Sequence, residues 1–153
     1  VPLHLSSSSQ TLARLENWIY TKRFLSSLVE KVQKKVELFP ELAHQLKLSK
    51  IETLWDFDEY VTGPLHGFAG AEDYYEKNSS IYFLPSIKVP VLIVNAANDP
   101  FLSEQCFPID LVNSLENVFL EIPNEGGHCG FYPNDYEGFL WSETRAIQWL
   151  RDV

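Results

Sequence analysis

VPVLIVNAANDPF, residues 89–101, has the pattern of a buried strand that ends in a polar turn. The apolar residues 91–94 follow one another without alternation, which is typical of a parallel strand covered on both faces. A second stretch, VFLEIPNEGGHCGF at residues 118–131, is again a short strand followed by a turn. Because residues 107–114 can form a crossover helix, the two stretches predict a βαβ unit with parallel strands.

The two turns carry one residue each of a catalytic type, Asp99 and His128. Functional side chains in parallel sheets lie just past the carboxyl ends of the strands. An Asp followed by a His on consecutive strands is the order of the second and third members of a Ser–Asp–His hydrolase triad. In such a triad the carboxylate orients the imidazole and stabilises its protonated form. We therefore predict that Asp99 contacts His128 and that both are catalytic.

Asp99, His128 and His66 can each also be interpreted as structural rather than functional residues. Asp-Pro is common turn chemistry after a strand, and a histidine in a glycine-rich loop is often a surface residue. The order and spacing of Asp99 and His128 favour catalysis over these alternatives. His66, in the stretch PLHGF, is either a substrate-cleft residue or a loop histidine satisfied by local hydrogen bonds.

No serine in this chain lies in the G-x-S-x-G motif that would supply the nucleophile. Cys129 is not expected to replace it, because adjacent side chains such as His128 and Cys129 usually point apart. The sequence has no metal-binding motif of the C-x-x-C or H-E-x-x-H type and no glycine-rich nucleotide-binding motif. We therefore expect neither a metal nor another cofactor.

The composition is that of a globular protein, with 153 residues, 45% hydrophobic and 14% aromatic. Its net charge of -9 argues against nucleic acid or an anionic membrane as the main partner. A small basic cluster, Lys31, Lys34 and Lys35, is interpreted as the solvated face of a helix. No apolar run reaches the length of a membrane span, and no signal peptide is visible.

Two cysteines, Cys106 and Cys129, are interpreted as free thiols in a reducing compartment, with a single bridge as the alternative. With no signal peptide, this predicts a cytoplasmic location. Because the sequence begins at Val1 and contains no methionine, we expect it to be part of a longer protein.

Upstream of the strands, apolar spacing predicts a helical region. Residues 10–37 form one helix or two with a break near Thr21. Shorter helices are expected over residues 40–48, 51–61 and 71–78, and a final helix over residues 141–150.

Several motifs resemble the C-terminal half of an α/β-hydrolase of the YheT-like subfamily. The generic ones are VNAANDP around Asp99 and GGHCGF around His128. The more specific ones are VPLHL at residues 1–5, TGPLHGF at 62–68, AEDYY at 71–75 and WSETRA at 141–146.

The resemblance implies an α/β class: a partial α/β-hydrolase fold in which a helical cap precedes the last βαβα of a parallel sheet. Residues 1–5 would end a sheet strand, residues 6–86 would form the cap region, and residues 87–153 would complete the core. The family hydrolyses carboxylic esters of the lipase and esterase kind with a serine nucleophile and no cofactor. Cap aromatics are expected to roof an acyl pocket: Trp18, Phe24, Trp55, Phe57, Tyr74 and Tyr75.

Without a nucleophile, residues 1–153 alone are expected to be inactive. The competing hypothesis is a non-catalytic hydrolase remnant that acts as a binding module. Two strands also leave a bare sheet edge, which we expect to pair with another copy or with the missing N-terminal half. A monodisperse monomer in solution would contradict that expectation.

Overall fold

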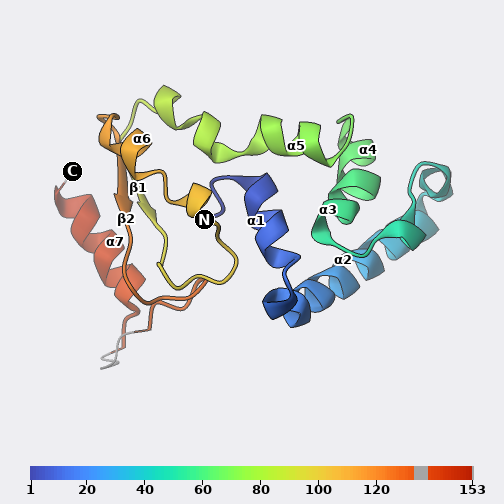
Figure 1. Cartoon of the computed structure of the whole chain (residues 1–153), viewed down its shortest axis with the longest axis horizontal. Helices are drawn as coiled ribbons and strands as arrows, with labels where there is room; N and C mark the ends of the chain where they lie inside the picture. Colours follow the sequence, from blue (N-terminus) through green and yellow to red (C-terminus); the bar gives the residue numbers. More distant parts are fainter. Residues whose placement is uncertain (133–137, 153) are drawn as a thin grey trace. The chain divides into compact units, whose positions relative to one another are not determined.

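The computed structural model describes residues 1–132 and 138–152 and divides the chain into two compact units (Figure 1). The helical unit is His4–Ser79, and the strand unit combines Val1–Leu3 with Ser80–Val153. Residues 80–86, which were predicted to belong to the cap region, lie in the strand unit. The role of the helical unit as a cap stays a prediction.

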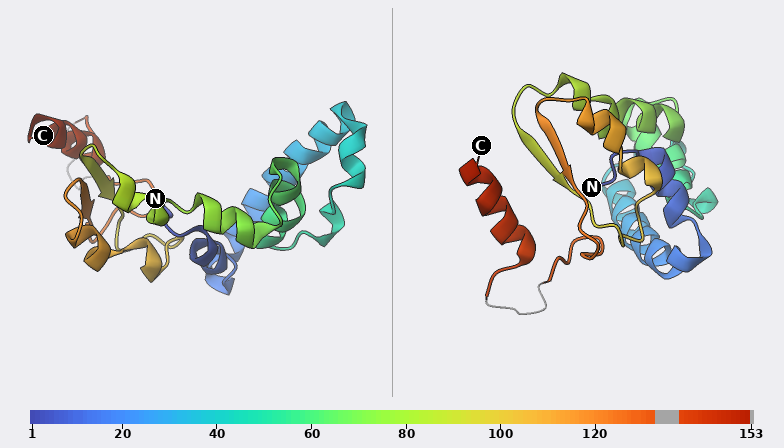
Figure 2. Two further views of the ribbon diagram at one scale, coloured as in Figure 1. Left: turned by 90° about the horizontal axis from the view of Figure 1, so that it is seen from above. Right: turned by 60° about the vertical axis from the view of Figure 1, so that its left-hand side comes forward.

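The strand unit contains a parallel pair of strands, β1 (Val91–Val94) and β2 (Val118–Glu121). Val91 pairs with Val118 and Val94 with Glu121, so the two strands run in step from end to end. The remaining elements are the short 3-10 turns Ser80–Tyr82, Leu84–Ser86 and Glu104–Cys106, helix α6 (Ile109–Asn113) and helix α7 (Trp141–Asp152). Figure 2 shows the two strands side by side and α7 alongside them. The predicted βαβ unit and final helix are confirmed.

One face of the sheet is packed against α6. Ile93 of β1 and Val118 of β2 are buried with Val112 of α6. Leu3 and Leu84 complete this core. Burying each such side chain contributes about 1.5–3 kcal/mol, so this cluster holds most of the stability of the unit.

The opposite face of the sheet is covered by α7. The Phe119 ring packs edge-on against Trp149, with 4.7 Å between centroids, and Arg145 Nε donates to both carboxylate oxygens of Glu121. The ion pair is partly exposed and contributes at most about 1 kcal/mol, so apolar packing attaches the helix. Cover on both faces explains why residues 91–94 are apolar without alternation.

The helical unit is built from short elements around one long helix. They are α1 (Leu5–Leu12), a 3-10 turn (Leu15–Asn17), α2 (Trp18–Leu38), 3-10 turns at Pro40–His44 and Leu48–Lys50, α3 (Leu54–Phe57), a π turn (Asp58–Thr62), α4 (Gly63–His66) and α5 (Ala71–Asn78). Their common core is Val32, Leu46, Phe57 and Val61. The break before α2 falls at Leu15–Asn17 rather than near Thr21.

The structure has no strand over residues 1–5, where the end of a sheet strand was predicted. Helix α1 begins at Leu5, and the ring of His4 caps it by accepting a hydrogen bond from the amide of Ser7. Within the described part of the chain the sheet contains only β1 and β2. Residues 1–5 therefore have no strand to pair with, and the cap at His4 favours a helix instead.

A partly buried carboxylate, that of Asp58, lies between the helices of this unit. Tyr75 donates to Asp58 Oδ2 at 2.6 Å, and Thr62 donates to Asp58 Oδ1 at 2.6 Å. Burial raises the pKa of Asp58, and the two hydroxyl donors only partly oppose this shift. Burial and the Asp58 carboxylate together raise the pKa of Tyr75 far above its ordinary value.

We predict that Asp58 destabilises the folded helical unit as the pH rises. A raised pKa means that the folded state holds the proton more tightly, so its stabilising effect is complete below the ordinary pKa of 3.8 and is lost as the pH rises through the folded value. As the pH rises from below 3.8 through the folded-state pKa of Asp58, the unfolding free energy of Asp58→Asn should fall less than that of the wild type. Chemical denaturation at a series of pH values checks this, with the exposed Glu16→Gln as control. Identical pH slopes for Asp58→Asn and the wild type would contradict it.

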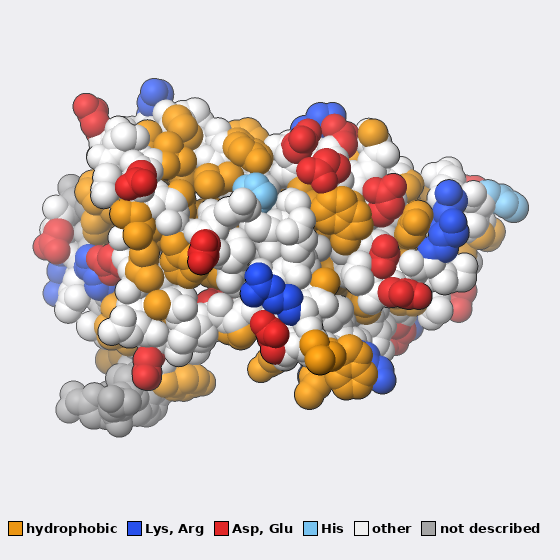
Figure 3. Space-filling view, in the orientation of Figure 1, with side chains coloured by type: hydrophobic (Ala, Val, Ile, Leu, Met, Phe, Trp, Pro, Cys, Tyr) orange, Lys and Arg blue, Asp and Glu red, His pale blue; other side chains and the backbone are white. Residues whose placement is uncertain are grey.

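Hydrophobic side chains reach the surface over the strands and α6 on the face shown in Figure 3. The large exposed ones in this unit include Val89, Ile109, Phe119, Ile147 and Leu150. A two-stranded sheet also has one unpaired edge on each strand. No helix among the described residues combines the length and the hydropathy needed to cross a membrane.

Candidate active site

Asp99 is held in a tight turn that begins where β1 ends. Its side chain is 2% exposed, its Oδ1 accepts from the amide of Phe101 at 2.9 Å, and its own amide donates to the carbonyl of Ala96. The buried Asn95 donates to the carbonyl of Cys106 at 2.9 Å, which anchors the segment beyond the turn. Backbone hydrogen bonds thus orient the Asp99 carboxylate independently of its contact with His128.

His128 lies in a tight loop in which two backbone amides donate to the same carbonyl. The amides of Gly130 and Phe131 both donate to the carbonyl of Gly126, at 2.9 and 3.1 Å. A Cβ at Gly126 would lie 2.5 Å from the Phe131 ring, so only glycine fits there. Gly127 has a φ of 55°, in the left-handed region that glycine adopts without strain. These features direct the His128 side chain back toward β1.

The two predicted residues meet. His128 Nδ1 lies 2.9 Å from Asp99 Oδ2. The His128 side chain is 42% exposed, and no described residue forms a hydrogen bond with its Nε2. One ring nitrogen is therefore held by a buried carboxylate while the other remains open to a reacting group, which is the arrangement a general base requires.

Further contacts tie the two turns together. Asn98 Oδ1 accepts from the amide of Gly127 at 2.9 Å, the Phe101 ring lies 4.7 Å from the His128 ring, and the amide of Ala97 donates to the carbonyl of Pro123 at 2.8 Å. The sequence analysis missed the roles of Asn98 and Phe101. The available signal was a pair of side chains, one amide and one aromatic, flanking an Asp at a strand end.

The other singled-out residues lie elsewhere. His66 ends α4 in the helical unit and lines a small cavity there, so its assignment to a substrate cleft stays a prediction. Cys106 is buried and Cys129 exposed, and the two form no disulfide bond with each other. Among residues 1–132 and 138–152, no three His, Cys, Asp or Glu side chains are grouped so that they could hold a metal ion.

The predicted roof aromatics differ in exposure. Phe57 and Tyr75 are buried, and Trp55 packs edge-on against Tyr75 with 5.2 Å between ring centroids. Trp18 and Phe24 are exposed. At least Phe57 and Tyr75 therefore serve the core of the helical unit, whether or not other aromatics touch a substrate.

Several known proteins are similar in sequence to this chain. An abhydrolase domain-containing protein of Dictyostelium discoideum is 29% identical over 97% of this chain. YheT of Escherichia coli strain K12, named as a candidate esterase, is 29% identical over 97% of the chain, and human monoacylglycerol lipase ABHD2 is 29% identical over 89%.

The chain is similar to the C-terminal part of α/β-hydrolases, YheT included. It covers 38%, 44% and 37% of the Dictyostelium, bacterial and human relatives, about two fifths of their length. No family model and no solved structure matches the chain. The predicted partial α/β-hydrolase fold is confirmed.

The contact with Asp99 should select one tautomer of His128. A buried carboxylate accepts a hydrogen bond from Nδ1–H, so the neutral ring should carry its proton on Nδ1 and leave the Nε2 lone pair free. Imidazole ¹⁵N chemical shifts of the chain, recorded where the ring is neutral, measure this directly. In Asp99→Ala the proton should move largely to Nε2, whereas in the exposed control His44→Gln the His128 signals should stay unchanged. A wild-type ring protonated on Nε2 would contradict the assignment.

Proposed function

We propose that a protein carrying this segment is a carboxylic-ester hydrolase of the serine type, with Asp99 and His128 as the acid and base of its triad. The observation that carries the proposal is the 2.9 Å contact between Asp99 and His128 at the ends of adjacent parallel strands. The relatives support hydrolase chemistry in general, since one is named a lipase and another a candidate esterase.

In the proposed reaction, His128 transfers two protons: from the serine to the leaving alcohol in acylation, and from water back to the serine in deacylation. A serine hydroxyl from outside residues 1–153 attacks the ester carbonyl while His128 Nε2 takes its proton. The protonated ring, stabilised by Asp99, then gives that proton to the departing alcohol. A water molecule, activated by the same nitrogen, attacks the acyl-enzyme and releases the carboxylic acid and the serine.

We infer an ester of a fatty acid with a small alcohol as the substrate class. The human relative is named a monoacylglycerol lipase, and aromatic side chains of the helical unit suit an apolar acyl chain. No cofactor is required for this chemistry.

We also infer a cytoplasmic location, supported by two cysteines that form no disulfide bond. We further infer that another strand pairs with the sheet edge, supplied by an upstream segment or a second copy. The alternative function is a non-catalytic hydrolase remnant that binds a partner. It is favoured only by the lack of a G-x-S-x-G motif in residues 1–153. Labelling with a fluorophosphonate of a protein that carries this segment separates the two, because only the enzyme has a reactive serine.

We predict that His128→Gln and Asp99→Asn each lower kcat by about 10⁴-fold in a protein that carries this segment downstream of a G-x-S-x-G motif. The substitutions remove the base and its correct tautomer while leaving ester binding largely intact. Turnover of p-nitrophenyl butyrate measures the effect, and His44→Gln is the control that should retain full activity.

The chain of residues 1–153 alone should show no turnover above background, since neither serine elbow nor oxyanion loop lies within it. Turnover by this chain that His128→Gln abolishes would overturn the proposal. So would an active longer protein that tolerates both substitutions.

A further inference from the structure

A small cavity in the helical unit has an apolar floor and a cationic rim. Its volume is about 200 Å³. The floor and walls are Leu28, Val32, Phe57, Val61 and Leu65, and the polar lining residues are Lys31, Lys35, Thr62 and His66. Three elements, α2, α3 with its π turn, and α4, therefore supply one site that the Asp99–His128 pair does not use.

The structure separates three lysines that the sequence analysis treated as one solvated face. Lys34 is paired, with its Nζ 2.7 Å from Glu30 Oε1. Lys31 and Lys35 form no ion pair with any described residue, and no acidic side chain lines the cavity beside them. In a chain with a net charge of -9, two unpaired lysines beside a histidine make a local excess of positive charge.

One acidic group next to the cavity is already engaged. Thr62, which lines the cavity, donates to Asp58, which also accepts from Tyr75. Two hydroxyl donors therefore already occupy the Asp58 carboxylate.

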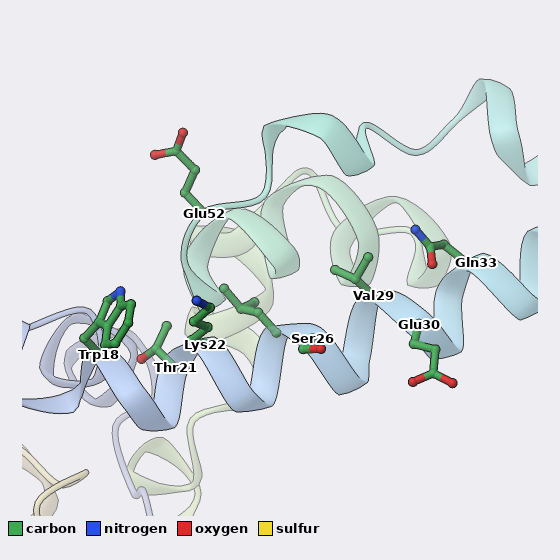
Figure 4. Close-up of a pocket in the computed structure, with 9 residues that line it drawn as sticks. Trp18, Thr21, Lys22, Ser26, Val29, Glu30, Gln33 and Glu52 are labelled. Atoms are coloured by element: carbon green, nitrogen blue, oxygen red, sulfur yellow. The ribbon is translucent and has the colours of Figure 1, made fainter.

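A second groove, along α2, lacks this excess of positive charge (Figure 4). It is larger, about 560 Å³, and its lining includes Lys22, Glu30 and Glu52. Charges of both signs there give no selectivity for an anion. The cavity beside Lys31, Lys35 and His66 instead combines apolar lining residues with lysines and no acidic side chain.

We propose that this cavity binds a free medium-chain fatty carboxylate. The carboxylate contacts Lys31 and Lys35, with His66 as a third donor, and the first part of the alkyl chain lies on Val61 and Leu65. Two flexible lysine side chains can both contact a single carboxylate, because an ammonium group does not require the fixed bidentate geometry of arginine. The volume is below the roughly 300–1,000 Å³ of most ligand pockets, which limits the buried part to a short alkyl segment. This site does not depend on the Asp99–His128 pair being catalytic.

The test uses the chain itself and octanoate as the probe. In ¹H–¹⁵N spectra, octanoate should shift the amides of residues 28–35 and 61–66 in a saturable way. Lys31→Gln combined with Lys35→Gln should weaken binding about five- to tenfold, as expected for two partly exposed charge contacts. The spectra also report whether each variant is folded.

Matched controls separate binding that depends on the lysine charges from nonspecific hydrophobic binding. Lys34→Gln, on the same helix but paired with Glu30, should leave the affinity for octanoate unchanged, and 1-octanol should bind more weakly than octanoate and be insensitive to Lys31→Gln and Lys35→Gln. Equal losses for Lys34→Gln and the double variant would overturn the proposal. Shifts scattered outside the cavity, or binding to phosphatidylglycerol vesicles without binding to octanoate, would overturn it too.

Discussion

The contact between the Asp99 carboxylate and the His128 ring is possible only because β1 and β2 are parallel neighbours in step with each other. Val94 pairs with Glu121 at the ends of the strands, so the two following turns emerge at the same edge of the sheet. A shift of one residue in this register would move every side chain to the opposite face and separate the turns. The candidate active site is thus a consequence of strand pairing, to which the loops add orientation.

The register is in turn fixed by packing on both faces of the sheet. Ile93 and Val118 are buried against α6 on one side, and Phe119 packs against Trp149 of α7 on the other. Apolar burial of about 1.5–3 kcal/mol per side chain outweighs the partly exposed ion pair of Arg145 with Glu121. The same hydrophobic pattern therefore determines both the stability of the strand unit and the position of its functional side chains.

The sequence predicted the parts of the fold that depend on strong local patterns. The unbroken apolar run at residues 91–94 and the glycines around His128 led to the strands, their parallel pairing and the Asp99–His128 contact. It failed at residues 1–5, where a strand was expected and the His4 cap begins a helix, because a strand needs a partner that local sequence does not reveal. The roles of Asn98 and Phe101 were missed as well, since both depend on how the second turn folds back on the first.

The central claim is that Asp99 acts through His128 rather than on its own. A double-mutant cycle on kcat/KM, with Asp99→Ala, His128→Ala and both together in an enzyme that carries this segment, tests it most directly. Groups that act as one unit are strongly non-additive, so the account predicts that the double variant is no slower than His128→Ala alone. Losses that multiply, with the double variant slower by the product of the single effects, would contradict it.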